Sequence, residues 1–373
     1  MKVNNPFILT GYVSSEYFCD RREETRKILS AVENNRNLTL FSIRRIGKTG
    51  LIEHAFHNLQ RQKKYNLIYL DILPTSDLKD FINVFAKAVI SGLETKPEQF
   101  FNKIGELFSS IRPTVSFDPI TGIPNIQFNL ETDKEVSQTL EKIFKYIKKQ
   151  KKRIVIAIDE FQQIVNYPEK NVEATLRANV QSTNNATFIF SGSHKHILLS
   201  MFGKYGRPFY QSTELLHLEK IEYERYKKFI GSKFEKGKKR IKDEHIDRIL
   251  KITRNHTYYV QFFCNRLYGL PFKSITDEII GKTLLDILQE NVSVYINYRN
   301  LLTSFQWNLL EAIAKEGSAK KLLSKEFIKT HSLTAASSVQ TALAALLNKE
   351  MIYKEDNYYF IYDVFFERWL ERI

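Results

Sequence analysis

The stretch that decides the fold of this chain is Ser42-Ile43-Arg44-Arg45-Ile46-Gly47-Lys48-Thr49. Residues 38–41, just before it, form an apolar run that fits a buried strand. Residues 51–59, just after it, carry apolar side chains at helical spacing. A strand, a short loop ending in Gly-Lys-Thr and a helix are the context that a Walker A motif requires. The stretch therefore predicts a phosphate-binding loop, with an ordinary strand-to-helix loop as the alternative.

Each position of this loop has a distinct chemical use. Backbone N–H groups of residues 45–49 can converge on phosphate oxygens beside a helix N-terminus. Gly47 permits close backbone approach, Lys48 can reach the β- and γ-phosphates, and the Thr49 hydroxyl can hold Mg²⁺. Ser42 stands where the motif has its first glycine, which is the one departure from the pattern. We expect the nucleotide to contact Arg44, Arg45, Ile46, Gly47, Lys48, Thr49 and Gly50.

A second apolar run, residues 154–158, ends in Asp159-Glu160. An unbroken apolar run suits a central parallel strand that is buried on both faces. Its carboxyl end is where open α/β sheets place their ligands. Asp159 would then hold Mg²⁺, as in a Walker B motif, and Glu160 would orient or deprotonate the attacking water. A solvated Asp-Glu turn is the alternative, and the Gly-Lys-Thr upstream favours the catalytic interpretation.

Two further pairs of side chains are candidates for nucleotide contact. Tyr17 and Phe18 precede the first strand, where they can fold over the base, although core packing explains either ring equally well. Ser191 and Ser193 end the predicted strand 186–193, where a hydroxyl can face the γ-phosphate. A plain Ser-Gly-Ser turn is the alternative for each serine.

The pattern beyond these motifs predicts three parts. Residues 1–220 alternate strands with helices, the first helix being expected to begin at an Asp20 cap, and a β-hairpin is inserted at about 112–130. Residues 221–300 are helical almost throughout. Residues 301–373 predict three helices followed by a β-hairpin, which is a winged helix-turn-helix pattern.

Composition limits the class of protein. With 373 residues, of which 43% are hydrophobic and 26% charged, the chain is typical of soluble globular proteins of two or three domains. We expect no membrane span, since no apolar run approaches about 18 residues, and no signal peptide. Cys19 and Cys264 lie far apart without metal-ligand spacing, which indicates a reduced, cytoplasmic location.

The net charge of +14 favours anionic partners, including nucleic acid. Basic residues cluster at 145–153 and 225–242, although each run also fits a solvated surface. The candidate recognition helix of the winged helix, residues 335–347, contains no Arg or Lys. Among the residue types that read base edges it offers only Gln340, so protein contact is an equally good use for it.

With these residues placed, the chain resembles a prokaryotic AAA+ ATPase of the archaeal-type ATPase family. That family is grouped with the STAND NTPases and is close to the Orc/Cdc6-like initiator ATPases. Paired arginines before Gly-Lys-Thr are characteristic of the archaeal-type ATPase family, and its members often lack the first glycine of the loop. The resemblance rests on Phe18-Cys19-Asp20-Arg21-Arg22-Glu23, the loop 42–49, Asp159-Glu160, Ser191-Gly192-Ser193, His256-Thr257-Tyr258-Tyr259-Val260-Gln261 and Tyr362-Asp363-Val364-Phe365-Phe366-Glu367-Arg368-Trp369-Leu370.

The resemblance implies an α/β fold: a P-loop parallel-sheet core over 1–220, an α-helical lid over 221–300 and a winged helix over 301–373. The nucleotide, magnesium and water-activating positions of the family match Lys48, Thr49, Asp159 and Glu160. Ser191 or Ser193 falls at the sensor 1 position, which is often Asn or Thr in AAA+ proteins.

Two more regions are implied by the resemblance. Arg207 lies where AAA+ rings carry an arginine finger, with a structural role as the alternative. The segment from Arg254 to Tyr259 matches the sensor 2 region, where Arg254 or His256 would touch phosphate and Tyr258 would line the base.

We therefore expect a Mg²⁺-dependent ATPase that binds ATP between core and lid and moves its winged helix on hydrolysis. The alternative is an ATP-switched DNA-binding protein with little intrinsic hydrolysis. ATP and ADP are the expected partners. DNA, a protein partner and further copies of the chain are the other candidates.

Overall fold

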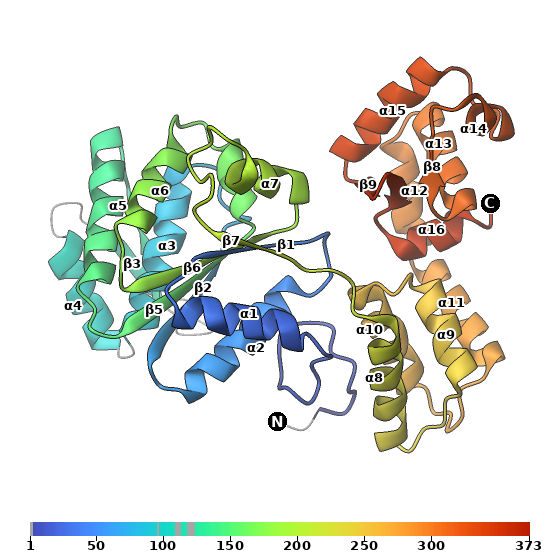
Figure 1. Cartoon of the computed structure of the whole chain (residues 1–373), viewed down its shortest axis with the longest axis horizontal. Coiled ribbons are helices and arrows are strands. Elements are labelled where there is room, and N and C mark those ends of the chain that lie inside the picture. Colours follow the sequence, from blue (N-terminus) through green and yellow to red (C-terminus); the bar gives the residue numbers. More distant parts are fainter. Residues whose placement is uncertain (1–2, 95–96, 109–112, 118–123) are drawn as a thin grey trace. The chain divides into compact units, whose positions relative to one another are not determined.

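The computed structural model of the chain describes residues 3–94, 97–108, 113–117 and 124–373. The chain divides into two compact units (Figure 1). One unit is Thr10–Lys220, and the other combines Met1–Leu9 with Ile221–Ile373. Residues 221–300 and 301–373, the predicted lid and winged-helix segments, both belong to the second unit.

A five-stranded parallel sheet forms the centre of the unit Thr10–Lys220. Its order is β2-β5-β6-β1-β7, so β6 lies between the strand that leads into the P-loop and the strand that ends in Asp159. The two strands β5 and β6 are buried along nearly their whole length, as the unbroken apolar runs predict. The strands are β1 (Leu38–Phe41), β2 (Tyr65–Asp71), β5 (Arg153–Asp159), β6 (Ala186–Gly192) and β7 (Glu214–His217).

Helices cover both faces of this sheet because successive residues of each buried strand point to opposite sides. One face is covered by α1 and α2, and the other by α3, α5 and α6 (Figure 1). Aromatic rings join the second layer to the sheet: Phe144 of α5 lies 5.3 Å from Phe85 of α3 and 6.3 Å from Phe188 of β6. These helices are α1 (Arg22–Glu33), α2 (Lys48–Arg61), α3 (Leu78–Leu93), α5 (Asp133–Lys148) and α6 (Val172–Gln181).

The start of α1 differs from the sequence prediction. The N-cap residue is Arg21, not Asp20, and no side chain in the described part of the structure caps this helix. Both residues have a left-handed backbone, with φ of 53° at Asp20 and 62° at Arg21. The chain therefore turns sharply before the helix, and that turn buries the Arg21 side chain.

Between α3 and α5 the chain adds helix α4 (Pro97–Phe108) and the antiparallel strands β3 (Thr114–Phe117) and β4 (Pro124–Gln127). Residues 118–123, within the segment of the predicted hairpin, lie outside the described residues. The 3₁₀ helix η1 (Phe161–Asn166) follows β5, and α7 (Lys195–Gly203) follows β6.

The second unit begins with a bundle of helices and ends in a winged helix. The bundle consists of α8 (Tyr223–Lys236), α9 (Asp243–Ile252), α10 (Thr257–Gly269), α11 (Asp277–Glu290) and α12 (Val292–Asn300). The helices of the winged helix are α13 (Ser304–Glu316), α14 (Lys325–Thr330), α15 (Ala336–Asn348) and α16 (Val364–Leu370). Its three-stranded sheet has the order β8-β10-β9, with β8 at Ala319–Lys320, β10 at Tyr358–Ile361 and β9 at Ile352–Glu355. Residues near the amino terminus join this unit, where the fully buried Phe7 ring packs 5.3 Å from Phe234.

The helical bundle and the winged helix share a polar and aromatic interface. Arg254, between α9 and α10, pairs with Glu367 of α16 at 2.7 Å, and its Nη2 also donates to the carbonyl of Ile361. Tyr259 packs edge-on against Phe365 at 5.1 Å. These buried contacts explain why the predicted lid and winged-helix segments form one unit.

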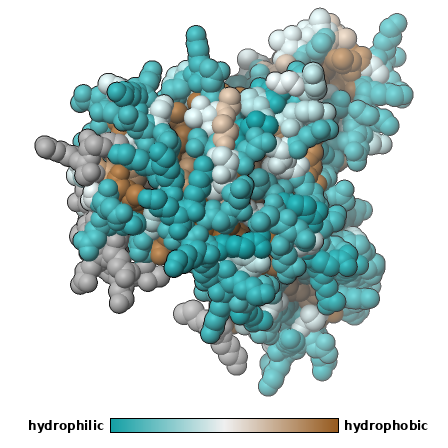
Figure 2. All heavy atoms as spheres, turned by 60° about the vertical axis from the view of Figure 1, so that its left-hand side comes forward, coloured by the Kyte–Doolittle hydropathy of each residue, from teal (hydrophilic) through white to brown (hydrophobic). Residues whose placement is uncertain are grey.

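The face of the molecule that Figure 2 presents is mainly polar. The face in Figure 2 is covered mostly by hydrophilic residues, with hydrophobic ones in small, scattered patches. Scattered exposed apolar residues are normal for folded proteins. Within the described part of the chain, no helix combines the length and apolarity that crossing a bilayer requires.

Candidate functional site

The loop between β1 and α2 is shaped to present backbone N–H groups. Arg45 has a φ of 64° and Gly47 a φ of 101°, both left-handed. Left-handed residues interleaved with right-handed ones turn successive N–H groups toward a common point, which makes an anion-binding concavity. Helix α2 begins at Lys48 directly after Gly47, so its N-terminal dipole also points at this loop. This geometry suits a phosphate group.

Lys48 lies inside the loop rather than in solvent. Its side chain is buried, and Nζ donates to the Ser42 hydroxyl at 3.3 Å. Burial lowers the pKa of Lys48, and the carboxylates of Glu160 and Asp159 offset part of that shift. Ser42, which replaces the first glycine of the motif, is fully buried and also donates to the carbonyl of Ile43 at 2.7 Å. The substitution therefore provides an acceptor that holds the ammonium group.

Four donors meet the Asp159 carboxylate at the carboxyl end of β5. Its Oδ2 accepts from the Thr49 hydroxyl at 2.9 Å and from the Tyr69 hydroxyl at 2.8 Å. Its Oδ1 accepts from the Ser191 hydroxyl and from the backbone N–H of Glu160 at 3.0 Å. Thr49 and Asp159 thus place hydroxyl and carboxylate oxygens side by side, which is the type of oxygen ligand that Mg²⁺ prefers.

Glu160 is held beside Asp159 by a separate set of contacts. Its Oε2 accepts from the Ser193 hydroxyl at 2.9 Å and from the Gln162 amide at 2.5 Å. The Ser193 hydroxyl also lies 3.4 Å from Nε of Arg44 in the P-loop. Glu160 itself has a φ of 54°, an uncommon left-handed conformation for a residue with a side chain. Strained backbone of this kind clusters at functional sites.

The two predicted aromatic contacts lie at the start of α2. The Phe18 ring stacks on His54 of that helix with centroids 4.3 Å apart. A Cβ added to Gly50 would lie 3.8 Å from the Phe18 ring, so the ring passes directly over the first turn of the helix. Tyr17 precedes Phe18 and is half-buried. Contact of either ring with a base stays a prediction.

Three other predicted residues have described contacts with residues outside this cluster. Arg207 forms an ion pair with Glu173 of α6, which gives it a structural partner within its own unit. Tyr258 belongs to the second unit, where it packs on Tyr259 and Phe262 of α10. Arg254, the candidate for a phosphate contact in the same region, is instead paired with Glu367. The arginine-finger role of Arg207 and the base-lining role of Tyr258 therefore stay predictions.

Three residues of the site are not among the predicted site residues. Tyr69 ends up beside Asp159 because β2 pairs in parallel with β5. Burial and the Asp159 carboxylate raise the pKa of the Tyr69 hydroxyl, so it remains a donor. Gln162 crosses Gly192 so closely that an added Cβ there would lie 1.9 Å from its amide oxygen. Arg21 reaches the P-loop carbonyl of Ile46 at 3.5 Å.

Comparison with known proteins matches two family models to this chain. A family described as an ATPase domain predominantly from Archaea matches residues 18–261, and a probable winged helix domain matches residues 293–372. An uncharacterized ATP-binding protein of Methanocaldococcus jannaschii is 30% identical over 166 residues, covering 41% of this chain and 45% of that protein. The chain thus spans less than half the length of this curated relative.

Two solved structures share the fold along almost the whole chain. A Walker-type ATPase of Pyrococcus abyssi has a TM-score of 0.66 at 17% identity, covering 99% of this chain and all of that one. The Orc2 protein of Aeropyrum pernix, solved in ADPNP-ADP complexes, has a TM-score of 0.58 at 13% identity, covering 98% and 95%.

The chain thus combines a P-loop core built on a parallel sheet with a winged helix, a fold that it shares with the Orc2 structure. The chain belongs to the family of ATPase domains found predominantly in Archaea. Its sheet order, its P-loop and its winged helix confirm the fold class that the sequence predicts.

Proposed function

We propose that this chain hydrolyses ATP with Mg²⁺ at the carboxyl ends of β1 and β5. One observation carries the proposal: the P-loop Lys48, the Thr49–Asp159 oxygen pair and Glu160 converge although they come from distant parts of the sequence. Phosphoryl transfer depends mainly on positioning and charge neutralisation, and these groups supply both.

Each group has a separate task in this proposal. The left-handed turns at Arg45 and Gly47 direct backbone N–H groups toward the phosphates, and Lys48 leaves its weak contact with Ser42 to meet the β- and γ-oxygens. Mg²⁺, bound with the help of Thr49 and Asp159, would neutralise phosphate charge. Ser191 keeps the Asp159 carboxylate oriented throughout.

Glu160 is the proposed general base. Among the described residues, the two side chains that donate to its carboxylate, Ser193 and Gln162, both do so at Oε2, so they fix the plane of the carboxylate without involving Oε1. Oε1 is therefore the oxygen that would accept the proton of the attacking water. Ser193 also contacts Arg44 of the P-loop, which links the orientation of the base to the conformation of the phosphate loop.

The nucleotide cycle would act on the second unit as one body. Arg254 and Glu367 join the helical bundle to the winged helix through a buried ion pair, so these parts are expected to move together. We infer that hydrolysis changes the position of this whole unit, rather than that of the winged helix alone.

The test compares Glu160→Gln with Asp159→Asn. Gln keeps an oxygen that accepts from Ser193 and removes only the basic group, so Mg-ATP affinity should stay at the parental value while turnover falls roughly 10²–10⁴-fold. Asp159→Asn should lower Mg²⁺-dependent affinity as well. Calorimetry gives the affinity, and steady-state phosphate release gives the rate.

Glu214→Gln is the matched control, because this carboxylate pairs with Arg36 on the exposed edge of the sheet. It should change neither quantity. Parental turnover in Glu160→Gln, measured where the parent turns over well, would remove Glu160 as the base.

DNA binding is a second candidate function, and the wing favours it. Lys320 and Lys354 are exposed on the three-stranded sheet, where each lies over a tyrosine ring, at 5.0 Å from Tyr358 and 5.5 Å from Tyr359. Such lysines can contact backbone phosphates. Helix α15 exposes uncharged residues, among them Gln340 and Thr341, so we propose contact with little base selection.

A further inference from the structure

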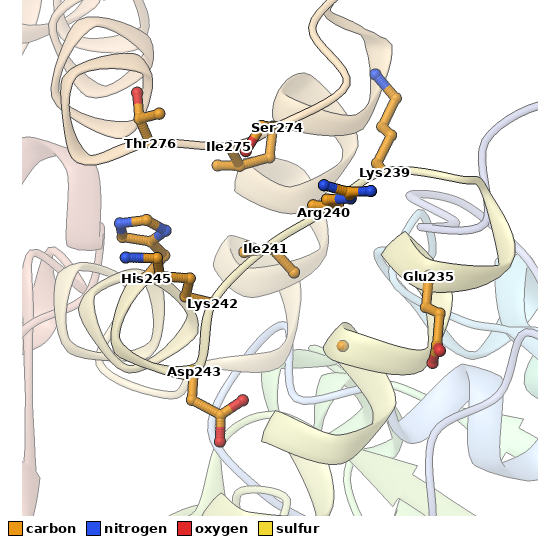
Figure 3. Close-up of a pocket in the computed structure, with 11 residues that line it drawn as sticks. Glu235, Lys239, Arg240, Ile241, Lys242, Asp243, His245, Ser274, Ile275 and Thr276 are labelled. Atoms are coloured by element: carbon orange, nitrogen blue, oxygen red, sulfur yellow. The ribbon is translucent and has the colours of Figure 1, made fainter.

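The second unit contains a cavity that the proposed ATPase mechanism does not use. Its volume is about 650 Å³. Its walls come from the end of α8, the start of α9 and the segment that precedes α11 (Figure 3). The charged and hydroxyl side chains that line it are Glu235, Lys239, Arg240, Lys242, Asp243, His245, Ser274 and Thr276.

Two helix N-termini meet at this cavity. Helix α9 begins at Asp243 and has 10 residues, and α11 begins at Asp277 and has 14. The Thr276 hydroxyl caps α11 by accepting from the N–H of Ile279, whereas no described side chain caps α9. Helix N-termini carry partial positive charge and N–H groups without an intrahelical acceptor, which together attract anions.

The backbone keeps these two N-termini together. The N–H of Arg240 donates to the carbonyl of Lys273 at 2.7 Å, and the N–H of Ile275 donates back to the carbonyl of Arg240 at 2.8 Å. These bonds fix the segment before α9 against the segment before α11. The site is therefore preformed on ordered backbone.

His245 gives independent evidence of a ligand. It is 8% exposed and lines the cavity between Lys242 and Thr276 (Figure 3). Its Nδ1 is buried without a hydrogen-bond partner among the described residues. Its Nε2 lies 3.9 Å from carboxylates of Glu244 and Asp277, beyond hydrogen-bond distance. A buried polar atom without a partner is costly, so a ligand that supplies one is favoured.

The charges around the cavity favour an anion. Arg240 and Lys242 are exposed and available to a ligand, although Lys242 also pairs with Glu244 at 3.1 Å. Of the nearby carboxylates, Asp243 lies 3.5 Å from Lys227 and Asp277 pairs with Arg248 at 2.8 Å.

Two lining residues contribute less to this charge balance. Lys239 is already engaged, because its Nζ donates to the carbonyls of Leu270 and Phe272. Glu235 adds one negative charge to the wall formed by the end of α8. The arginine, the lysine, the histidine and the two helix N-termini remain as anion-attracting groups.

We propose that this cavity binds a phosphate group, with Arg240, Lys242, His245 and the N-terminus of α9 as its ligands. A tetrahedral oxyanion can accept from donors that converge on it from several directions, as these groups do. The site is separate from the P-loop, which belongs to the other unit. It is also separated from the Arg254–Tyr258 segment by the length of α9, about 15 Å at 1.5 Å per residue.

The test titrates inorganic phosphate into the full chain carrying Lys48→Ala, which removes the ammonium group that would bind phosphate at the P-loop. The chain has eight histidines, so selective ¹³C labelling of histidine gives few resonances, and His245→Gln assigns the one of interest. We expect a saturable shift of the His245 resonance. Arg240→Ala/Lys242→Ala should weaken binding about tenfold to a hundredfold.

The control variant is Lys228→Ala/Lys238→Ala, which removes two exposed charges of the same basic run outside the cavity. It should leave the affinity within about twofold of the parent, since surface charges that do not touch the ligand contribute little. An equal loss in both double variants, or an unmoved His245 resonance at high phosphate, would overturn the proposal. Neither result depends on ATP hydrolysis, so the proposed ATPase function stands or falls separately.

A second arm identifies the source of the phosphate. Anisotropy of a labelled duplex DNA is measured with the same variants. If nucleic acid supplies the group, Arg240→Ala/Lys242→Ala weakens DNA binding more than the control does, and free phosphate competes with DNA. If DNA affinity is the same in both double variants while phosphate still shifts His245, the ligand is a small phosphate compound.

Discussion

The ion pair between Arg254 and Glu367 makes a sharp prediction about how the second unit is held together. Glu367 is 1% exposed and the Arg254 side chain is 10% exposed, and their charged atoms lie 2.7 Å apart. Replacing Glu367 with alanine would leave the guanidinium with the carbonyl of Ile361 and the ring of Phe360, whose centroid is 5.5 Å away. Neither partner carries a compensating full charge.

The expected cost follows from this burial. Removing one partner of a buried ion pair commonly lowers the free energy of unfolding by about 3–5 kcal/mol, because the other charge stays desolvated. For a domain of 150–250 residues, 1 kcal/mol shifts the melting temperature by about 2–4 °C, so we expect a shift of roughly 6–20 °C. The effect should fall on the transition of the second unit, which contains both residues.

Tryptophan fluorescence isolates that transition. The chain has two tryptophans, Trp307 of α13 and Trp369 of α16, and both lie in the winged helix. Trp307 is buried and Trp369 packs against the same core. Thermal unfolding followed by their emission therefore reports the unit in which Arg254 and Glu367 pair.

Glu290→Ala is the control for this experiment. Glu290 pairs with Arg266 on the surface of the same unit, with side chains 53% and 40% exposed, and such pairs contribute about 0–1 kcal/mol. The double replacement Arg254→Met/Glu367→Leu should recover most of the lost stability, since no isolated charge remains. If Glu367→Ala shifts the melting temperature no further than Glu290→Ala does, the ion pair does not hold the helical bundle to the winged helix.

Three further predictions concern the site and the wing. Lys48→Ala should abolish most ATP affinity in calorimetry, and unchanged affinity would contradict the P-loop assignment. Tyr69→Phe keeps the ring but removes the hydroxyl that donates to Asp159 at 2.8 Å. The Mg²⁺ concentration needed for half-maximal ATP binding should therefore change, with little effect on stability. An identical Mg²⁺ dependence would show that Tyr69 does not act on this carboxylate. Lys320→Ala/Lys354→Ala should weaken duplex DNA binding and flatten its salt dependence by about two counterions, and a steep, sequence-selective response would contradict backbone contact by the wing.

The sequence alone determined the P-loop, the Asp159-Glu160 strand end and the winged-helix pattern. Each of these is encoded locally. The Gly-Lys-Thr follows a strand and opens a helix, so loop conformation and helix start are set within a few residues. The run 154–158 is apolar at every position because both faces of β5 are covered. Local patterns of this kind are independent of how distant segments pair.

Only the tertiary structure decided which side chains surround these motifs. Tyr69 reaches Asp159 because β2 and β5 pair in parallel with Asp71 opposite Asp159, a register that no local pattern specifies. Arg254 resembles a phosphate ligand in sequence, yet the fold places it against Glu367, far along the chain. The physical reason is the same in both cases: a buried polar group must be paired, and its partner is chosen by the packing of whole elements rather than by neighbours in sequence.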